Sequence, residues 1–251
     1  MNLVTVIIPY YRKKEYILKT LNSIFNQSFK KFEILIIYDD ENKDDLIFLK
    51  KIKNKKIKIL INRKNLGVGH SRNKGIKKTK TKYIAFCDAD DIWEKDKLKK
   101  QIFFMEKLNL NFSHTNYKII NDKDKIIGKM KIKKKLNYND LLKSCDIGLS
   151  TVVIKSKILK KNLFNKLKTK EDYALWLKFL RDGVEIIGIN ETLAYWRKNS
   201  NSLSSDTTQK VLDAFRLYNK HENFNIFSSA YLTIRLSIFY LIKKISQKMH
   251  L

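Results

Sequence analysis

The chain has 251 residues, of which 43% are hydrophobic, so it can bury a substantial core as one domain. Its formal net charge of +28 excludes an acidic protein and points to an anionic partner such as nucleic acid, a membrane surface or a phosphorylated substrate. Only 7 of the 53 basic residues are arginine, and the lysines are spread along the whole chain, so part of this charge reads as a composition bias.

The first part of the chain alternates apolar runs with amphipathic segments. Residues 3–8, 32–38 and 57–61 have the length and apolar content of buried strands. Apolar residues recur at helical spacing over 17–25, and a second helix is predicted over about 44–51. This alternation predicts an α/β fold with a doubly wound, mainly parallel sheet.

The next apolar run, 83–87, stops abruptly at three carboxylates, Asp88, Asp90 and Asp91. Ligands of open α/β sheets bind at the carboxyl ends of the strands. Carboxylates this close repel one another, and a divalent cation that prefers oxygen ligands relieves the repulsion. The run therefore predicts a site for a metal and a phosphate. The alternative is an acidic cap for the following helix, although a cap needs only one Asp.

Polar groups also follow the other predicted strands. Asp39 is suited to accept a hydrogen bond from a base or ribose, and Tyr10 or Tyr11 could stack on the base. Arg72, at the start of a predicted helix, could reach a phosphate or a base edge, or could be a solvated helix residue. Glu171 and Asp172 by themselves read as the acidic first turn of a helix.

The remainder of the chain changes in pattern twice. Residues 112–120, 125–132 and 149–154 have the pattern of strands, and the first two are expected to form a hairpin. Beyond Asp206 the pattern is helical. One apolar stripe comprises Phe224, Phe227, Tyr231, Ile234, Ile238, Leu241, Ile242, Ile245 and Met249, with Lys243, Lys244 and Lys248 off it. The stripe either lies on an anionic membrane surface or packs on the domain, and both readings stay open.

The chain has two cysteines, Cys87 and Cys145, which lack metal-ligand spacing, and its N-terminus lacks a signal-peptide pattern. Both observations predict a cytoplasmic protein with reduced thiols. The helical C-terminal segment adds the possibility of peripheral attachment at the inner face of the plasma membrane.

Five motifs, in order, resemble those of a known family. They are Val4-Thr5-Val6-Ile7-Ile8-Pro9-Tyr10-Tyr11, Asp39-Asp40, Asn65-Leu66-Gly67 with Ser71-Arg72-Asn73-Lys74-Gly75, Asp88-Ala89-Asp90-Asp91, and Glu171-Asp172-Tyr173 with Leu175-Trp176. Through them, residues 1–205 resemble a family 2 glycosyltransferase with the GT-A fold, of the bacterial cell-surface polysaccharide type.

The resemblance implies roles for individual residues. Asp39 would contact the nucleoside, and Asp88 would lie by the ribose. Asp90, with Asp88, would ligate a divalent metal, Mn²⁺ or Mg²⁺, that holds the diphosphate, and Asp172 would be the catalytic base. The implied nucleotide-sugar site as a whole comprises Pro9, Tyr10, Tyr11, Asp39, Asn65, Arg72, Asp88, Ala89 and Arg197.

The resemblance thus implies an inverting, metal-dependent glycosyltransferase that moves a sugar, in the first place from a UDP-sugar, to a hydroxyl of a glycan or lipid-linked glycan. Residues 1–205 would form the catalytic domain, with a nucleotide-sugar half at about 1–110 and an acceptor half at about 111–205, and 206–251 would form a helical extension. No nucleic-acid partner is expected on this reading. Two alternatives stay open: a basic nucleic-acid-binding protein, and a nucleotidyltransferase on a similar sheet.

Overall fold

A computed structural model describes the backbone of residues 1–199 and 206–249, and the side chains within these ranges up to residue 242. A ten-stranded sheet has the order β3-β2-β1-β4-β9-β6-β10-β5, with β7 paired to β6 and β8 paired to β10. The strands are β1 (Val4–Tyr10), β2 (Phe32–Tyr38), β3 (Ile57–Ile61), β4 (Tyr83–Phe86), β5 (Ile92–Trp93), β6 (Phe112–Ile120), β7 (Ile126–Met130), β8 (Lys135–Leu136), β9 (Val153–Lys155) and β10 (Ile186–Arg197).

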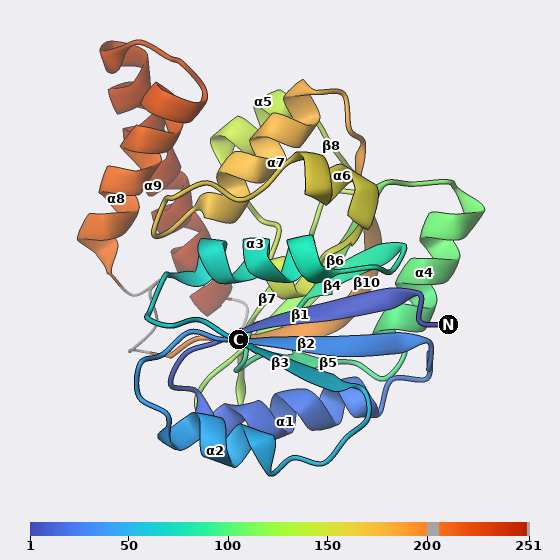
Figure 1. Cartoon of the computed structure of the whole chain (residues 1–251). Coiled ribbons are helices and arrows are strands. Elements are labelled where there is room, and N and C mark those ends of the chain that lie inside the picture. The colour runs from blue at the N-terminus through green and yellow to red at the C-terminus, as the bar shows by residue number, and fades with distance from the viewer. Residues whose placement is uncertain (200–205, 250–251) are drawn as a thin grey trace.

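Helices cover both faces of the sheet, with α3 on one side of β1–β3 and α1 and α2 on the other (Figure 1). The α-helices are α1 (Lys14–Phe25), α2 (Asp44–Lys50), α3 (Val68–Lys78), α4 (Lys97–Lys107), α5 (Tyr138–Lys143), α6 (Ser156–Lys161), α7 (Glu171–Arg181), α8 (Thr207–Arg216) and α9 (Ile226–Met249), and two shorter helical segments are η1 (Leu149–Thr151) and η3 (Leu217–His221). This arrangement confirms the predicted doubly wound α/β fold with a helical C-terminal segment.

Strand β1 explains why the first apolar run is continuous. It pairs in parallel with β2 on one side and with β4 on the other. Val4, Val6 and Ile8 pack in the core cluster that contains α1, whereas Ile7 belongs to the cluster on the opposite face. A strand buried on both faces needs apolar residues at almost every position, and here the exception is Thr5, whose hydroxyl is hydrogen-bonded to that of Thr81 (2.8 Å).

The predicted strands 32–38, 57–61 and 112–120 coincide with β2, β3 and β6, and the β6–β7 hairpin is antiparallel as expected. The predicted strand 149–154 is wrong in its first half, which forms η1 before β9 begins. The physical reason is Ser150, whose hydroxyl donates to Asp91 (2.5 Å) and accepts from the backbone N–H of Asp88 (3.0 Å), so this side chain ties the segment to the β4 turn.

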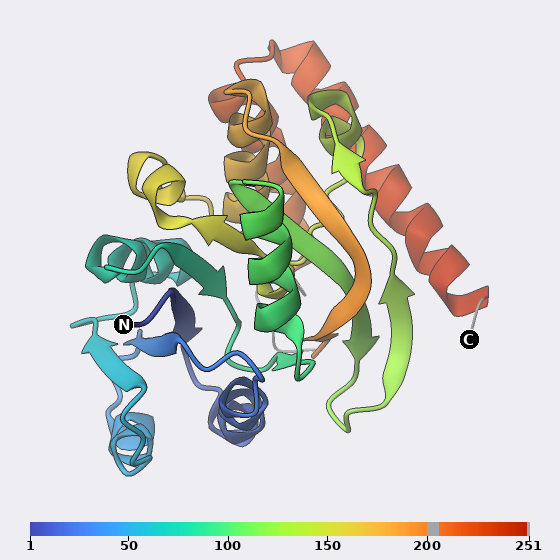
Figure 2. The ribbon, with the colours of Figure 1, turned by 90° about the vertical axis from the view of Figure 1, so that its right-hand side faces the viewer.

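Most of the apolar stripe on α9 faces the outside, whereas Phe224, which precedes the helix, is partly buried against the core. Ser229 and Thr233 are buried against the domain, whereas Phe227 is 88% exposed and Ile234 is 60% exposed. Figure 2 shows α9 running along the side of the molecule beyond β7, opposite the side that carries α2. Ile245, Met249 and the lysines at 243, 244 and 248 have side chains outside the described residues. Among the described residues, no helix has the length and apolar content required to cross a bilayer.

Substituting Gly75 with alanine tests how closely α3 packs on β1. A Cβ at Gly75 would lie 2.8 Å from Cγ2 of Ile7. Helix propensity favours alanine by up to about 1 kcal/mol, but overpacking a core costs about 1–3 kcal/mol. We expect Gly75→Ala to lower the free energy of unfolding in urea. Lys77→Ala on the exposed face of α3 is the control and should change it by no more than about 0.5 kcal/mol. A stabilised Gly75→Ala protein would contradict this packing.

Candidate active site

The predicted site residues gather at one edge of the sheet. Because β1, β2 and β4 are parallel neighbours, the residues that follow them meet at the carboxyl ends of these strands. Asp39 follows β2, and Asp88 and Asp90 follow β4. The loops that leave β1 and β2 at this edge lie on the left in Figure 1, on the same side as α8 and α9.

A buried arginine joins three elements at this edge. Arg72, on α3, is 4% exposed and forms an ion pair with Asp88 through Nη2 (2.8 Å) and another with Glu171 through Nη1. Glu171 and Asp172 begin α7. The structure therefore brings the carboxylate after β4 and the acidic start of α7 to the same guanidinium, although they are more than 80 residues apart in sequence.

Burial dominates the electrostatics of the α7 carboxylates. It raises the pKa of Glu171 to about 7, against the opposing pull of Arg72. Burial also raises the pKa of Asp172, while Arg72 and the backbone N–H of Tyr173, which donates to Asp172 Oδ1 (2.7 Å), lower it. A carboxylate with a raised pKa has a stronger affinity for a proton than an ordinary one, and this suits a general base.

Asp90 has contacts of a different kind. Its Oδ2 lies 2.7 Å from the ammonium of Lys13 and accepts a hydrogen bond from Asn199 (3.0 Å). The neighbouring Asp91 is 1% exposed and accepts from Ser150 and from the backbone N–H of Arg197 (2.8 Å). Asp91 therefore fixes the turn, whereas Asp88 is half-buried and Asp90, which is 9% exposed, is held by Lys13 and Asn199.

The predicted nucleoside side of the site is built on Asp39. This carboxylate is 3% exposed and accepts from Asn62 (2.8 Å) and from the backbone N–H groups of Leu66 and Gly67 (both 2.9 Å). Asn65, in the same loop, is exposed and accepts from Gly67 through Oδ1 (3.0 Å). Asp39 thus holds the Asn65 loop against the end of β2.

The two tyrosines near the end of β1 differ in exposure. Tyr10 is completely buried, stacks on Tyr38 with 5.6 Å between ring centroids, and donates to Asp45 (2.8 Å). Tyr11 is 41% exposed, and the guanidinium of Arg12 lies over its ring. Pro9 is half-buried within β1. Of these two tyrosines, only Tyr11 therefore has a ring that a base could reach in this structure.

Ala89 and Arg197 lie deeper. Ala89 is 3% exposed, and its carbonyl accepts from Thr20 (3.0 Å). Arg197 is 2% exposed, donates to the carbonyls of Asp90 (2.9 Å) and Asn121 (2.8 Å), and pairs with Asp124 (2.6 Å). Its predicted contact with a diphosphate stays a prediction, since the structure gives it this other set of partners.

The sequence reasoning missed Lys13 and Ser150, which contact Asp90 and Asp91 from distant elements. The position of Lys13 could have been predicted, because it lies in the short segment between β1 and α1 and therefore at the carboxyl edge of the sheet. No comparable signal marked Ser150, which lies about 60 residues from its partner.

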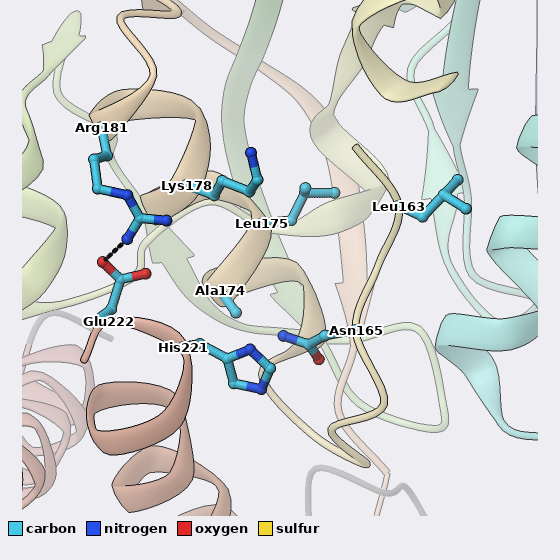
Figure 3. Close-up of a pocket in the computed structure, with 8 residues that line it drawn as sticks. All are labelled: Leu163, Asn165, Ala174, Leu175, Lys178, Arg181, His221 and Glu222. Carbon is cyan, nitrogen blue, oxygen red and sulfur yellow. Dashed lines mark hydrogen bonds and ion pairs between the residues drawn. The ribbon is translucent and has the colours of Figure 1, made fainter. Parts of the chain in front are cut away.

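The structure also contains a small pocket between α7 and η3, drawn in Figure 3. Arg181 and Glu222 form an ion pair (2.7 Å) at its rim, and His221 and Lys178 line it. None of the predicted site residues lines this pocket, so it is separate from the carboxyl edge.

Comparison with known proteins agrees with this architecture. The model of the family described as "Glycosyl transferase family 2" matches residues 5–168. Escherichia coli UDP-Glc:alpha-D-GlcNAc-diphosphoundecaprenol beta-1,3-glucosyltransferase WfgD is 35% identical over 83% of this chain and 82% of its own length. The putative teichuronic acid biosynthesis glycosyltransferase TuaG of Bacillus subtilis is 32% identical over 93% of this chain and 94% of its own.

Solved structures agree in fold. Residues 1–349 of S. aureus TarS in complex with UDP-GlcNAc superpose with a TM-score of 0.69 at 21% identity, covering 92% of this chain and 70% of that one. The mannosyltransferase PcManGT of Pyrobaculum calidifontis, in complex with GDP-Man and Mn²⁺, gives a TM-score of 0.67 at 15% identity, covering 91% and 69%. The chain belongs to glycosyl transferase family 2 and has the fold of that family's GT-A enzymes.

Proposed function

We propose that this chain transfers a sugar from a nucleotide-diphosphate donor to a hydroxyl of a glycan or lipid-linked glycan, with inversion, in the synthesis of a cell-surface polysaccharide. The observation that carries the proposal is Arg72, which holds Asp88 and the Glu171–Asp172 pair at one point on the carboxyl edge. A donor bound beside Asp88 would then have its reacting carbon near a carboxylate base. The names of the E. coli and B. subtilis relatives support the same substrate class.

The donor side lies along this edge, where Tyr11 and Asn65 are exposed and Asp39 is buried. Tyr11 stacks on the base, Asp39 and Asn65 hold the nucleoside, and Asp88 lies by the ribose. Pro9 and Ala89 shape the floor of the site as buried or half-buried apolar residues. A UDP-sugar is the donor that we propose, because the E. coli relative is named for UDP-Glc and the TarS structure contains UDP-GlcNAc.

Asp88 and Asp90 would hold a divalent metal, Mn²⁺ or Mg²⁺. One oxygen of each carboxylate is bonded to a protein cation, and the other has no protein donor in the part of the chain that the structure describes. The same part contains no cluster of three or more His, Cys, Asp or Glu side chains arranged to hold a metal by themselves. Metals that bind phosphates use one or two carboxylates and take further ligands from the substrate, so two suffice.

When bound there, the cation would neutralise the diphosphate and stabilise the charge that develops as it leaves. Asp172 accepts the proton of the attacking hydroxyl. The hydroxyl attacks the anomeric carbon on the side opposite the diphosphate, and this single displacement inverts that centre. Arg72 keeps Asp88 and Glu171 in place while the charge changes.

The division of the chain follows from these roles. Residues 1–205 form the catalytic domain, with the donor half at about 1–110 and the acceptor half at about 111–205, and 206–251 form a helical extension.

The extension associates peripherally with an anionic membrane surface, because α9 exposes Phe227, Ile234 and Ile238 on one face. A lipid-linked acceptor would then lie within reach of the catalytic domain at the inner face of the plasma membrane.

Incubation with a panel of nucleotide sugars and Mn²⁺, with or without a lipid-linked glycan, tests the function. The proposal predicts release of a free nucleoside diphosphate that the acceptor stimulates. Pyrophosphate release would instead identify a nucleotidyltransferase. Salt-sensitive binding of random DNA without any turnover would identify a nucleic-acid-binding protein.

Asp172→Asn tests the base. The amide keeps the size of the side chain but cannot accept the proton, so we expect transfer to fall by about 10²-fold or more while donor binding is retained. Because burial raises the pKa of Asp172, wild-type kcat/KM should rise with pH through a range above that of an ordinary Asp, and the variant should lose this limb. Asp182→Asn, at the exposed end of α7, is the control. Transfer near the wild-type rate in Asp172→Asn would place the base elsewhere.

Asp90→Asn tests the metal site. An amide is a weaker ligand than a carboxylate for a hard cation. We therefore expect the affinity for Mn²⁺ in the presence of a nucleoside diphosphate, measured by calorimetry, to fall by about tenfold or more. Metal-dependent turnover should be lost. The fold should be retained, since the amide keeps the size of the side chain and its oxygen can still accept the hydrogen bond from Asn199. Asp44→Asn on α2 is the matched control. Unchanged Mn²⁺ affinity in Asp90→Asn would remove this residue from the metal site.

A further inference from the structure

A groove runs between α5 and α9, beside the outward apolar stripe. It encloses about 470 Å³, which is within the range of small-molecule sites, and its lining includes Leu142, Lys143, Phe224, Tyr231, Leu232 and Arg235. Tyr231 and Arg235 are four residues apart on one face of α9, and Phe224 lies just before the helix begins at Ile226. That face adjoins the exposed Phe227, Ile234 and Ile238.

The groove contains two cations, Lys143 and Arg235, that form no ion pair with a described residue. Five of the seven arginines of the chain, residues 12, 72, 181, 197 and 216, pair with carboxylates. Of the other two, Arg63 is exposed, whereas Arg235 is partly buried. Within the described ranges neither Arg235 nor Lys143 forms an ion pair, and the buried Nε of Arg235 has no hydrogen-bond partner. The contacts of Arg235 are the carbonyl of Leu142 (3.4 Å) and the ring of Tyr231 (5.6 Å to the centroid).

A guanidinium without a carboxylate partner among the described residues, next to an ammonium and two aromatic rings, suits a phosphate attached to an apolar chain. We propose that this groove binds the phosphate headgroup of an anionic membrane lipid while the neighbouring stripe of α9 enters the acyl boundary. A second copy of the chain is a poorer occupant, because it would carry the same net charge of +28 to this face. The inference rests on the proposed membrane association and assigns it a specific headgroup site.

Flotation with vesicles tests the headgroup site. The full chain is mixed with vesicles of phosphatidylcholine alone or with 30% phosphatidylglycerol. The test protein carries Lys143→Gln and Arg235→Gln. The matched control carries Lys53→Gln and Lys55→Gln, which remove the same charge from the exposed loop after α2, on the opposite side of the molecule.

We expect the wild type and the control to bind the anionic vesicles and to prefer them to the neutral ones. The groove variant should bind about 10- to 30-fold more weakly, since each cation near an anionic surface contributes about 1 kcal/mol. Nucleoside diphosphate release from the free donor should be the same in all three proteins, which separates this site from the catalytic function.

Four outcomes would overturn the inference. If the groove variant and the control bind equally while Phe227→Ser with Ile238→Ser abolishes binding, the membrane association stands but the headgroup site does not. If the wild type ignores anionic vesicles, the proposed association fails as well. If sedimentation velocity shows a wild-type dimer that is absent in the groove variant, the occupant is a second copy. If inorganic phosphate at millimolar concentration displaces the protein from vesicles and another salt of equal ionic strength does not, the occupant is a free anion.

Discussion

The arrangement of this site depends on one buried charge. Arg72 is 4% exposed and lies between Asp88 and Glu171, which come from β4 and α7. Burying a guanidinium is costly unless carboxylates pair with it, and removing one partner leaves the others uncompensated. The three elements that carry these residues must therefore keep their relative positions. Strand β9 supports this, because it pairs with β4 and with β6 and so joins β1–β4 to β6 and β10 within one sheet.

The first half of the fold was predictable because its signals are local. Strands β1 and β4 are almost entirely apolar because they are buried on both faces, and β2 and β3 each carry one charged residue, Glu33 or Lys58, in an otherwise apolar run. The second half was less predictable. Strand β10 is twelve residues long but contains Asn190, Glu191 and Thr192, which break the apolar pattern where its pairing with β6 shifts register. The two-residue strand β5 exists through its pairing with β10, which no local pattern announces.

The site divides in the same way. Asp88 and Asp90 were predictable because one strand end places both. The pairing of Arg72 with Glu171, 99 residues away, was not, since only the tertiary fold brings them together. The apolar stripe of α9 was visible in the sequence, but its direction was not. Helices usually turn such a stripe inward, whereas here Ser229 and Thr233 face the domain and Phe227 faces out.

The most direct measurement of the central constraint is a double-mutant cycle on Arg72 and Glu171. Free energies of unfolding in urea are compared for the wild type, Arg72→Met, Glu171→Gln and the double variant at pH 7. If the buried pair holds the two halves together, the double variant should be less destabilised than the sum of the single ones by about 1 kcal/mol or more. The exposed pair of Lys100 and Glu191 is the reference, with a coupling expected at no more than about 1 kcal/mol and typically less. Additive effects at Arg72 and Glu171, within about 0.5 kcal/mol, would contradict the account.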